Sequence, residues 1–238
     1  MLRNYFKTIT RNISRNKGFT AINVIGLSLG LAAFIAITEY VKFETSFDNY
    51  NEHSEEIIRL GMETNLGGSE IAVPFFGPPV AEVIKAEFPE VVKATRLYPW
   101  IRREYFVKHK DLEIKEPVMT RLFADDNFFE FFDIALINGD VKEVLSDPNS
   151  VVLTEEMVTK YFGTDWKESE VIGEFIEVQG LEKPLQVTGI SEAVPSNSHF
   201  DYHFLISMST LGDEATDTHW LSNAFYHYLQ LRPDANPD

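Results

Sequence analysis

The sequence predicts an α+β protein in which one transmembrane helix near the N-terminus precedes a domain that mixes helices and strands. Three observations lead to this fold class. An apolar stretch is long enough to cross a bilayer. The segments after it alternate between the apolar spacing of strands and that of helices. The hydrophobic content of 44%, with 19 Phe, is enough to build a folded core.

Residues 19–42 form the predicted transmembrane helix. The apolar stretch within them has about 23 residues, or roughly 34 Å of helix, and a hydrocarbon core is roughly 30 Å thick. Residues 24–37 carry no charge. A secretory signal peptide is the alternative, but its apolar region is shorter, at about 7–15 residues, and it ends at a small-residue cleavage site. Neither feature is present, so we favour a helix that stays in the membrane.

Small residues are ordered along this helix. Gly26 and Gly30 form a G-x-x-x-G pair, and Ser28, Ala32 and Ala36 form a second row at four-residue spacing. Such rows allow the backbone of another helix to approach closely, which predicts a helix-packing partner in the membrane. The alternative is that glycine and alanine are simply common in membrane helices.

Residues 1–18 are predicted to form a basic amphipathic helix on the cytoplasmic face. Arg3, Lys7, Arg11 and Arg15 recur every four residues opposite an apolar row, a pattern that binds anionic membrane lipid. Residues 16–18 resemble the end of that helix. A disordered basic tail is the alternative.

Charge divides the chain unequally. Residues 1–18 hold five basic and no acidic residues, whereas the remainder has 16 basic and 37 acidic residues. The positive-inside rule therefore places the N-terminus in the cytoplasm and residues 43–238 outside the membrane. An acidic domain also argues against a nucleic-acid partner. No cysteine is present, which excludes disulfides and thiolate chemistry.

The first elements of the domain form a predicted β-α-β unit. Residues 57–64 have the spacing of a strand, residues 65–68 that of a turn, residues 80–88 that of a helix, and residues 91–100 that of a second strand.

Two more strands are predicted at residues 102–110 and 113–123, and a short helix at 125–132. The acidic residues of that helix suit N-terminal caps better than metal ligands. The other predicted elements are a strand at 150–153, a helix from Thr154 to Phe162, and strands at 173–178, 185–192, 200–207 and 225–232.

Catalytic motifs are missing from the sequence, so we expect no enzyme activity, no cofactor and no metal. There is no P-loop, no G-x-S-x-G and no H-E-x-x-H. His199 and His203 lie four apart in a predicted strand, where their separation of about 13 Å is too long for one metal. The neighbouring Ser198 and His199 fit a turn better than a catalytic pair.

Several motifs occur together in one order. They are RNISRNKGFTAINVIGLSLGLA, ETSFDNYN followed by IIRL, FPEV at 88–91, DDNFFEFF at 125–132, SVVLTEEMVTKYFG at 150–163 and VTGISEAVPSNSHFDY at 187–202. Over nearly the whole chain, their order and spacing resemble the MacB/FtsX-type ABC transporter permeases.

The resemblance implies a subunit of the bacterial inner membrane with a periplasmic core domain at residues 43–238. In this family a porter-like part built of β-α-β units holds a β-rich insert. That implies a first unit at 55–101, an insert at 102–215 and the start of a second unit at 216–238. Three further transmembrane helices are also implied, so we expect this chain to be part of a longer permease.

The implied partners are a separate ABC ATPase subunit, the further transmembrane helices of a dimeric permease, and a periplasmic adaptor or substrate protein. The resulting function is export or extraction of a substrate, driven by ATP hydrolysis in the ATPase subunit. The alternative is a single-pass, membrane-anchored periplasmic sensor or binding domain. A second subunit with a P-loop, or three further apolar stretches, would distinguish the two functions.

Overall fold

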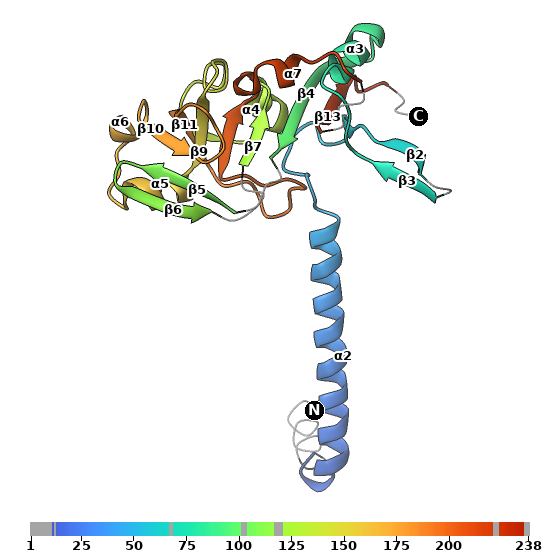
Figure 1. Ribbon diagram of the computed structural model, residues 1–238. Coiled ribbons are helices and arrows are strands. Elements are labelled where there is room, and N and C mark those ends of the chain that lie inside the picture. The colour runs from blue at the N-terminus through green and yellow to red at the C-terminus, as the bar shows by residue number, and fades with distance from the viewer. Residues whose placement is uncertain are drawn as a thin grey trace. The chain divides into compact units, whose positions relative to one another are not determined.

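A computed structural model describes residues 11, 13–66, 69–100, 104–116, 121–220 and 224–235. The chain divides into two compact units, Met1–Phe47 and Asp48–Asp238. The second unit holds the sheet and the short helices between residues 80 and 216 (Figure 1).

The first unit contains helix α2, Lys17–Glu44, which covers the predicted span and extends two residues beyond each end. Within the described part of the chain it is the one helix that is long and apolar enough to cross a membrane. None of its side chains is buried. Asn16 lies outside the helix with φ −117°, but Lys17 and Gly18 begin α2. The prediction that residues 16–18 end an earlier helix is therefore wrong for the last two.

The second unit is built on one sheet that has eleven strands among the described residues (Figure 1). Their order from one edge is β1 (Ile57–Arg59), β13 (Tyr226–Leu231), β4 (Val91–Pro99), β7 (Arg121–Ala124), β12 (Phe204–Ser207), β9 (Ser150–Thr154), β11 (Leu185–Ser191), β10 (Phe175–Val178), β5 (Tyr105–His109) and β6 (Leu112–Glu116), while β8 (Leu136–Asn138) pairs with β11.

The β-α-β unit has a third strand within it. Strand β13 lies antiparallel to both β1 and β4, so β1 and β4 run parallel to each other. Helix α3, Val80–Glu87, contacts β4 and β13. Its Ala81 N–H donates a hydrogen bond of 3.1 Å to Nδ1 of the buried His227. This bond satisfies one of the four N–H groups that every helix leaves open at its start.

A separate hairpin, β2 (Met62–Leu66) with β3 (Ser69–Val73), follows β1. The prediction of one continuous strand at 57–64 is wrong, because Leu60 and Gly61 separate β1 from β2. The predicted turn at 65–68 is also too long, because Asn65 and Leu66 pair with Glu70 and Ser69 in the hairpin.

Two other predicted strands are wrong in extent. Residues 113–123 contain the two strands β6 and β7, with residues 117–120 outside the described set. The strand predicted at 200–207 begins only at Phe204, so His199 and His203 do not share a strand. The short elements β8 and α6 (Glu168–Val171) were not predicted.

Both faces of the central sheet are covered. Along β12, Phe204 and Ile206 belong to one apolar cluster and Leu205 to another, as expected when successive side chains point to opposite faces. Helix α5, Glu155–Phe162, packs on the first cluster through Met157 and Val158. The remaining short helices are α4 (Phe128–Phe132), η1 (Met208–Leu211) and α7 (Asp213–Thr216).

A buried carboxylate connects α5 to the edge of the sheet. Glu116 of β6 accepts a hydrogen bond from the Tyr161 hydroxyl at 2.5 Å. It also forms an ion pair with Lys160, with 2.7 Å between Nζ and Oε1. Burial, followed by the bond to Glu116, raises the pKa of Tyr161 well above its ordinary value. Because a buried charge is costly without partners, these two bonds are the physical reason that Glu116 can lie inside.

The division of this unit into residues 55–101, 102–215 and 216–238 remains a prediction.

Candidate functional site: the entry segment

The first nine residues of the second unit, 48–56, follow shortly after helix α2; we call them the entry segment. Asp48 begins it with φ +60°, a left-handed conformation that aspartate tolerates better than most residues. Its backbone N–H donates to Asn197 O at 2.8 Å, and its Oδ1 accepts from the backbone N–H of His199 at 3.1 Å. Asp48 is therefore held by the loop 194–200 through bonds in both directions.

His199 extends this connection into the sheet. Its Nδ1 lies 2.8 Å from Asp48 Oδ1, and its Nε2 lies 2.7 Å from the Tyr228 hydroxyl of β13. Because the carboxylate can only accept, Nδ1 carries a hydrogen in this arrangement. Burial raises the pKa of Tyr228, which keeps its phenol neutral as a hydrogen-bonding group. A continuous polar chain thus runs from the first residue of the domain to β13, the second strand from the edge of the sheet.

The next residues of the entry segment bind helix α4. Asn51 is 5% exposed, and its Nδ2 donates to Phe131 O at 2.9 Å while its Oδ1 accepts from His53 N–H at 2.7 Å. The backbone N–H of Glu52 donates to Asp133 Oδ2 at 2.9 Å. Each buried bond of this kind contributes about 1 kcal/mol, and an orphaned partner costs more.

Tyr50 supplies a third contact. Its hydroxyl lies 3.1 Å from Ser198 Oγ, and burial, reinforced by Asp48 and Asp133, raises the pKa of Tyr50 to about 12. The loop that receives it is itself a turn, in which Ser198 N–H donates to Pro195 O at 2.9 Å. The prediction of a turn at this place agrees with the structure.

An aromatic cluster stands between the loop and α4. The ring of Phe200 lies 4.8 Å from Phe132 and 5.7 Å from Phe128, and Phe132 lies 5.2 Å from Tyr228. Edge-to-face packing of this kind favours one fixed arrangement of rings. The polar contacts of the entry segment therefore rest on a packed core rather than on a mobile loop.

The residues predicted to act in the membrane form no site within the described chain. Gly26 and Gly30 have no atom within 4 Å of the position that a Cβ would take, and Ser28, Ala32 and Ala36 are exposed on α2. The packing partner proposed for them stays a prediction.

In the leader, Arg11 and Arg15 are helical and exposed, whereas Arg3 and Lys7 fall outside the described residues. No group of three or more His, Asp or Glu side chains gathers around a possible metal position among the residues that the structure describes.

Comparison with known proteins supplies the family. The sequence matches the family described as the MacB-like periplasmic core domain over residues 20–238. The chain belongs to this family. The chain is a MacB-like domain of the kind found in ABC transporter permeases, joined to an apolar helix that is long enough to anchor it in a membrane.

Solved structures agree with this fold. A domain from Porphyromonas gingivalis, assigned to a permease protein, matches 79% of this chain and 77% of its own with a TM-score of 0.66 and 21% identity. The periplasmic region of MacB from Actinobacillus actinomycetemcomitans matches 76% of this chain and 77% of its own with a TM-score of 0.51 and 13% identity. No curated protein matches the sequence.

The structure brings together three of the motifs that carried the resemblance. The MacB-like domain places FDNYN, the helix in DDNFFEFF and the turn in VPSNSHFDY in mutual contact at the entry segment. Sequence reasoning identified each as a motif but missed their contacts. The available signal was the density of Asn, Asp and Tyr directly after the apolar helix.

Proposed function

We propose that this chain belongs to the membrane subunit of an ABC transporter and that the entry segment transmits movement of the membrane helix to the periplasmic domain. A separate cytoplasmic ATPase would supply the energy, and the permease would act as a dimer with further transmembrane helices. The observation that carries the proposal is the fixed entry segment. A passive tether needs no buried contacts, whereas force transmission requires that residues 48–52 be bonded to the domain they move.

The orientation that follows has residues 1–18 in the cytoplasm, on the inner-membrane lipid, and residues 43–238 in the periplasm. Because the sequence has no cysteine, single labels test it. In intact cells with a permeabilised outer membrane, an impermeant thiol reagent should label Ser69→Cys but not Ser14→Cys. The reverse result would contradict the orientation.

The coupling itself can be tested with a reporter on the domain. The exposed Ser146 is replaced by cysteine and labelled with an environment-sensitive fluorophore, and the intact permease is purified with its ATPase in vesicles. ATP should change the fluorescence in the wild type. Asn51→Ala removes both the bond to α4 and the bond to His53, so it should reduce the fluorescence change while ATP hydrolysis continues.

Glu87→Ala is the matched control, because Glu87 is exposed and lies outside both the entry segment and the turn that carries the label at position 146. It should leave the response unchanged. If no P-loop subunit purifies with the protein, or if ATP changes nothing in the wild type, the single-pass sensor or binding domain becomes the better function. If Asn51→Ala responds like the wild type, the transport role can stand but the entry segment does not carry the movement.

A further inference from the structure

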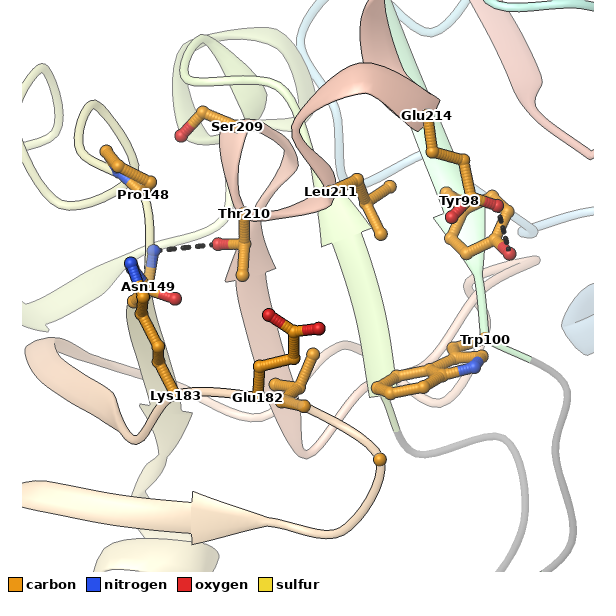
Figure 2. A pocket seen from close by; sticks show the side chains of 12 residues that line it. Tyr98, Trp100, Pro148, Asn149, Glu182, Lys183, Ser209, Thr210, Leu211 and Glu214 are labelled. Carbon is orange, nitrogen blue, oxygen red and sulfur yellow. Dashed lines mark hydrogen bonds between the residues drawn. The ribbon is translucent and has the colours of Figure 1, made fainter.

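A pocket of about 560 Å³ lies beside the sheet, and none of its lining residues belongs to the entry segment (Figure 2). Its walls come from the end of β4, the turn between β10 and β11, the residues just before β9, and the η1–α7 region. The volume is within the range of about 300–1,000 Å³ that is typical of ligand pockets.

The aromatic wall of the pocket is rigid. Trp100 is 8% exposed, and the guanidinium of Arg121 lies 4.2 Å from the centre of its ring. Gly180 has φ +97°, and a Cβ there would lie 3.1 Å from Trp100, so the turn passes close to the indole edge. Tyr98 packs on Phe225 with ring centroids 5.0 Å apart. These rings are fixed in place, and only their small exposed parts line the pocket.

Charge is distributed unevenly along the pocket. Figure 2 shows the carboxylate of Glu214 beside Tyr98, the carboxylate of Glu182 between Thr210 and Trp100, and Lys183 extending toward Asn149. Glu214 Oε1 accepts a hydrogen bond of 3.1 Å from the Tyr98 hydroxyl, which orients the carboxylate and leaves its second oxygen as an acceptor. One end of the pocket therefore combines aromatic rings with Glu214, Glu182 lies between the two ends, and the other end carries hydrogen-bond donors.

The donor end is also built from fixed atoms. Asn149 has φ +63°, its N–H donates to Thr210 Oγ1 at 2.9 Å, and its carbonyl accepts from Gln186 N–H at 2.8 Å. These two bonds hold the Asn149 backbone in place. Its side-chain amide lines the pocket and can bind a ligand. The Thr210 hydroxyl accepts from Asn149, so its own hydrogen remains to be donated.

We propose that this pocket binds a lysine or arginine side chain of a partner polypeptide. The cationic group would lie between Glu182 and Glu214, its methylene stem would cover Trp100 and Tyr98, and the backbone carbonyl next to it would accept from Asn149 or Lys183. Long basic side chains bury their stems against aromatic surface and keep the charge near carboxylates. The acidic excess of the domain, 37 acidic against 16 basic residues beyond residue 18, attracts such a partner from a distance.

The test uses the full chain in detergent, with Trp166→Phe and Trp220→Phe so that Trp100 is the remaining one of three tryptophans. The probe is the blocked tripeptide acetyl-Gly-Lys-Gly-amide, compared with acetyl-Gly-norleucine-Gly-amide, which keeps the stem and lacks the charge. The lysine peptide should change the fluorescence of Trp100 saturably, and the norleucine peptide should bind at least about threefold more weakly.

Variants separate the pocket from the general acidity of the domain. Glu182→Gln combined with Glu214→Gln should weaken binding of the lysine peptide about three- to tenfold, because two exposed charge contacts are lost. Glutamine at 214 can still accept from Tyr98, which preserves the local fold. Glu143→Gln with Glu155→Gln changes the net charge equally at exposed positions outside the pocket and should have no effect.

Three results would overturn the proposal. They are equal binding of the two peptides, equal weakening by both pairs of variants, and no saturable change with the lysine peptide up to about 10 mM. That limit lies above the roughly 1 mM dissociation constant that corresponds to a binding free energy of about 4 kcal/mol. Peptide binding needs neither ATP nor the ATPase. Its failure would therefore leave the proposed transport function untouched, and failure of the transport function would leave the pocket untouched.

Discussion

The buried His227 should make the domain less stable in mild acid. Burial, followed by the positive charge of Arg96, lowers the pKa of His227 to about 4, against a smaller opposing effect of the Gly77 backbone. Arg96 lies directly opposite His227 in the register of β4 and β13. In the folded state the imidazole is therefore neutral at neutral pH, with Nδ1 accepting from Ala81 N–H.

The sign of the effect follows from the lowered pKa. An unfolded histidine has a pKa of about 6.5, so between pH 6.5 and pH 4 the unfolded chain binds a proton that the folded chain does not. The stability that this group contributes is complete above about pH 6.5 and is lost as the pH falls toward 4. From this one group, the free energy of unfolding should decrease by about 2 kcal/mol between pH 7.5 and pH 5.

The measurement is urea unfolding of the full chain in detergent, followed by tryptophan fluorescence. All three tryptophans lie beyond residue 47, so the signal reports the second unit and not the membrane helix. His227→Asn keeps an oxygen that can accept from Ala81 but cannot titrate. Its unfolding free energy should fall less with acid than that of the wild type, by about 2 kcal/mol over the same interval. Parallel pH profiles would refute the reasoning, whatever the absolute stability of the variant.

Three further predictions concern other parts of the chain. Tyr161→Phe removes a hydrogen bond to the buried carboxylate of Glu116, so urea unfolding should show a loss of about 1–3 kcal/mol; a loss within error would mean that water replaces the hydroxyl. Gly30→Leu should insert normally but reduce recovery of the ATPase and the other membrane helices in a detergent pull-down, whereas Phe34→Leu should not; equal recovery would exclude the packing face. The purified chain alone should hydrolyse no ATP, and turnover by it without a second subunit would contradict the subunit role.

The elements with long, regular spacing could be predicted from the sequence. Helices α2 and α3 and strand β4 were located within two residues at each end, because their apolar periodicity is unbroken over many residues. The merged strand at 113–123 failed because the alternation continues through Pro117 into β7, and spacing alone cannot show where one strand stops. Strand β8 has three residues, too few for a period to be detected.

The contacts of the entry segment could not be predicted for a different reason. Asn51 bonds to Phe131, and Asp48 pairs with His199, so the partners are separated by 80 and 151 residues. Local spacing contains no information about such pairs. The residues also have the composition of an ordinary turn, because the same Asn and Asp side chains that bind distant backbone groups would bind nearby ones in a loop.

The position of β13 in the sheet has a consequence for the order of synthesis. This strand lies between β1 and β4, and its Leu229 pairs with Ile58. The pairing of β1 therefore forms only after one of the last described strands has been synthesised. While the chain emerges, the facing edges of β1 and β4 stay unpaired and able to bind other strands. Such distant pairing is also slow to form. Tyr228, the partner of His199, arrives with the same strand, so the polar chain from Asp48 through His199 to the sheet is completed only at this late stage. Until β13 has paired with β1 and β4, these unpaired strands are accessible to proteases.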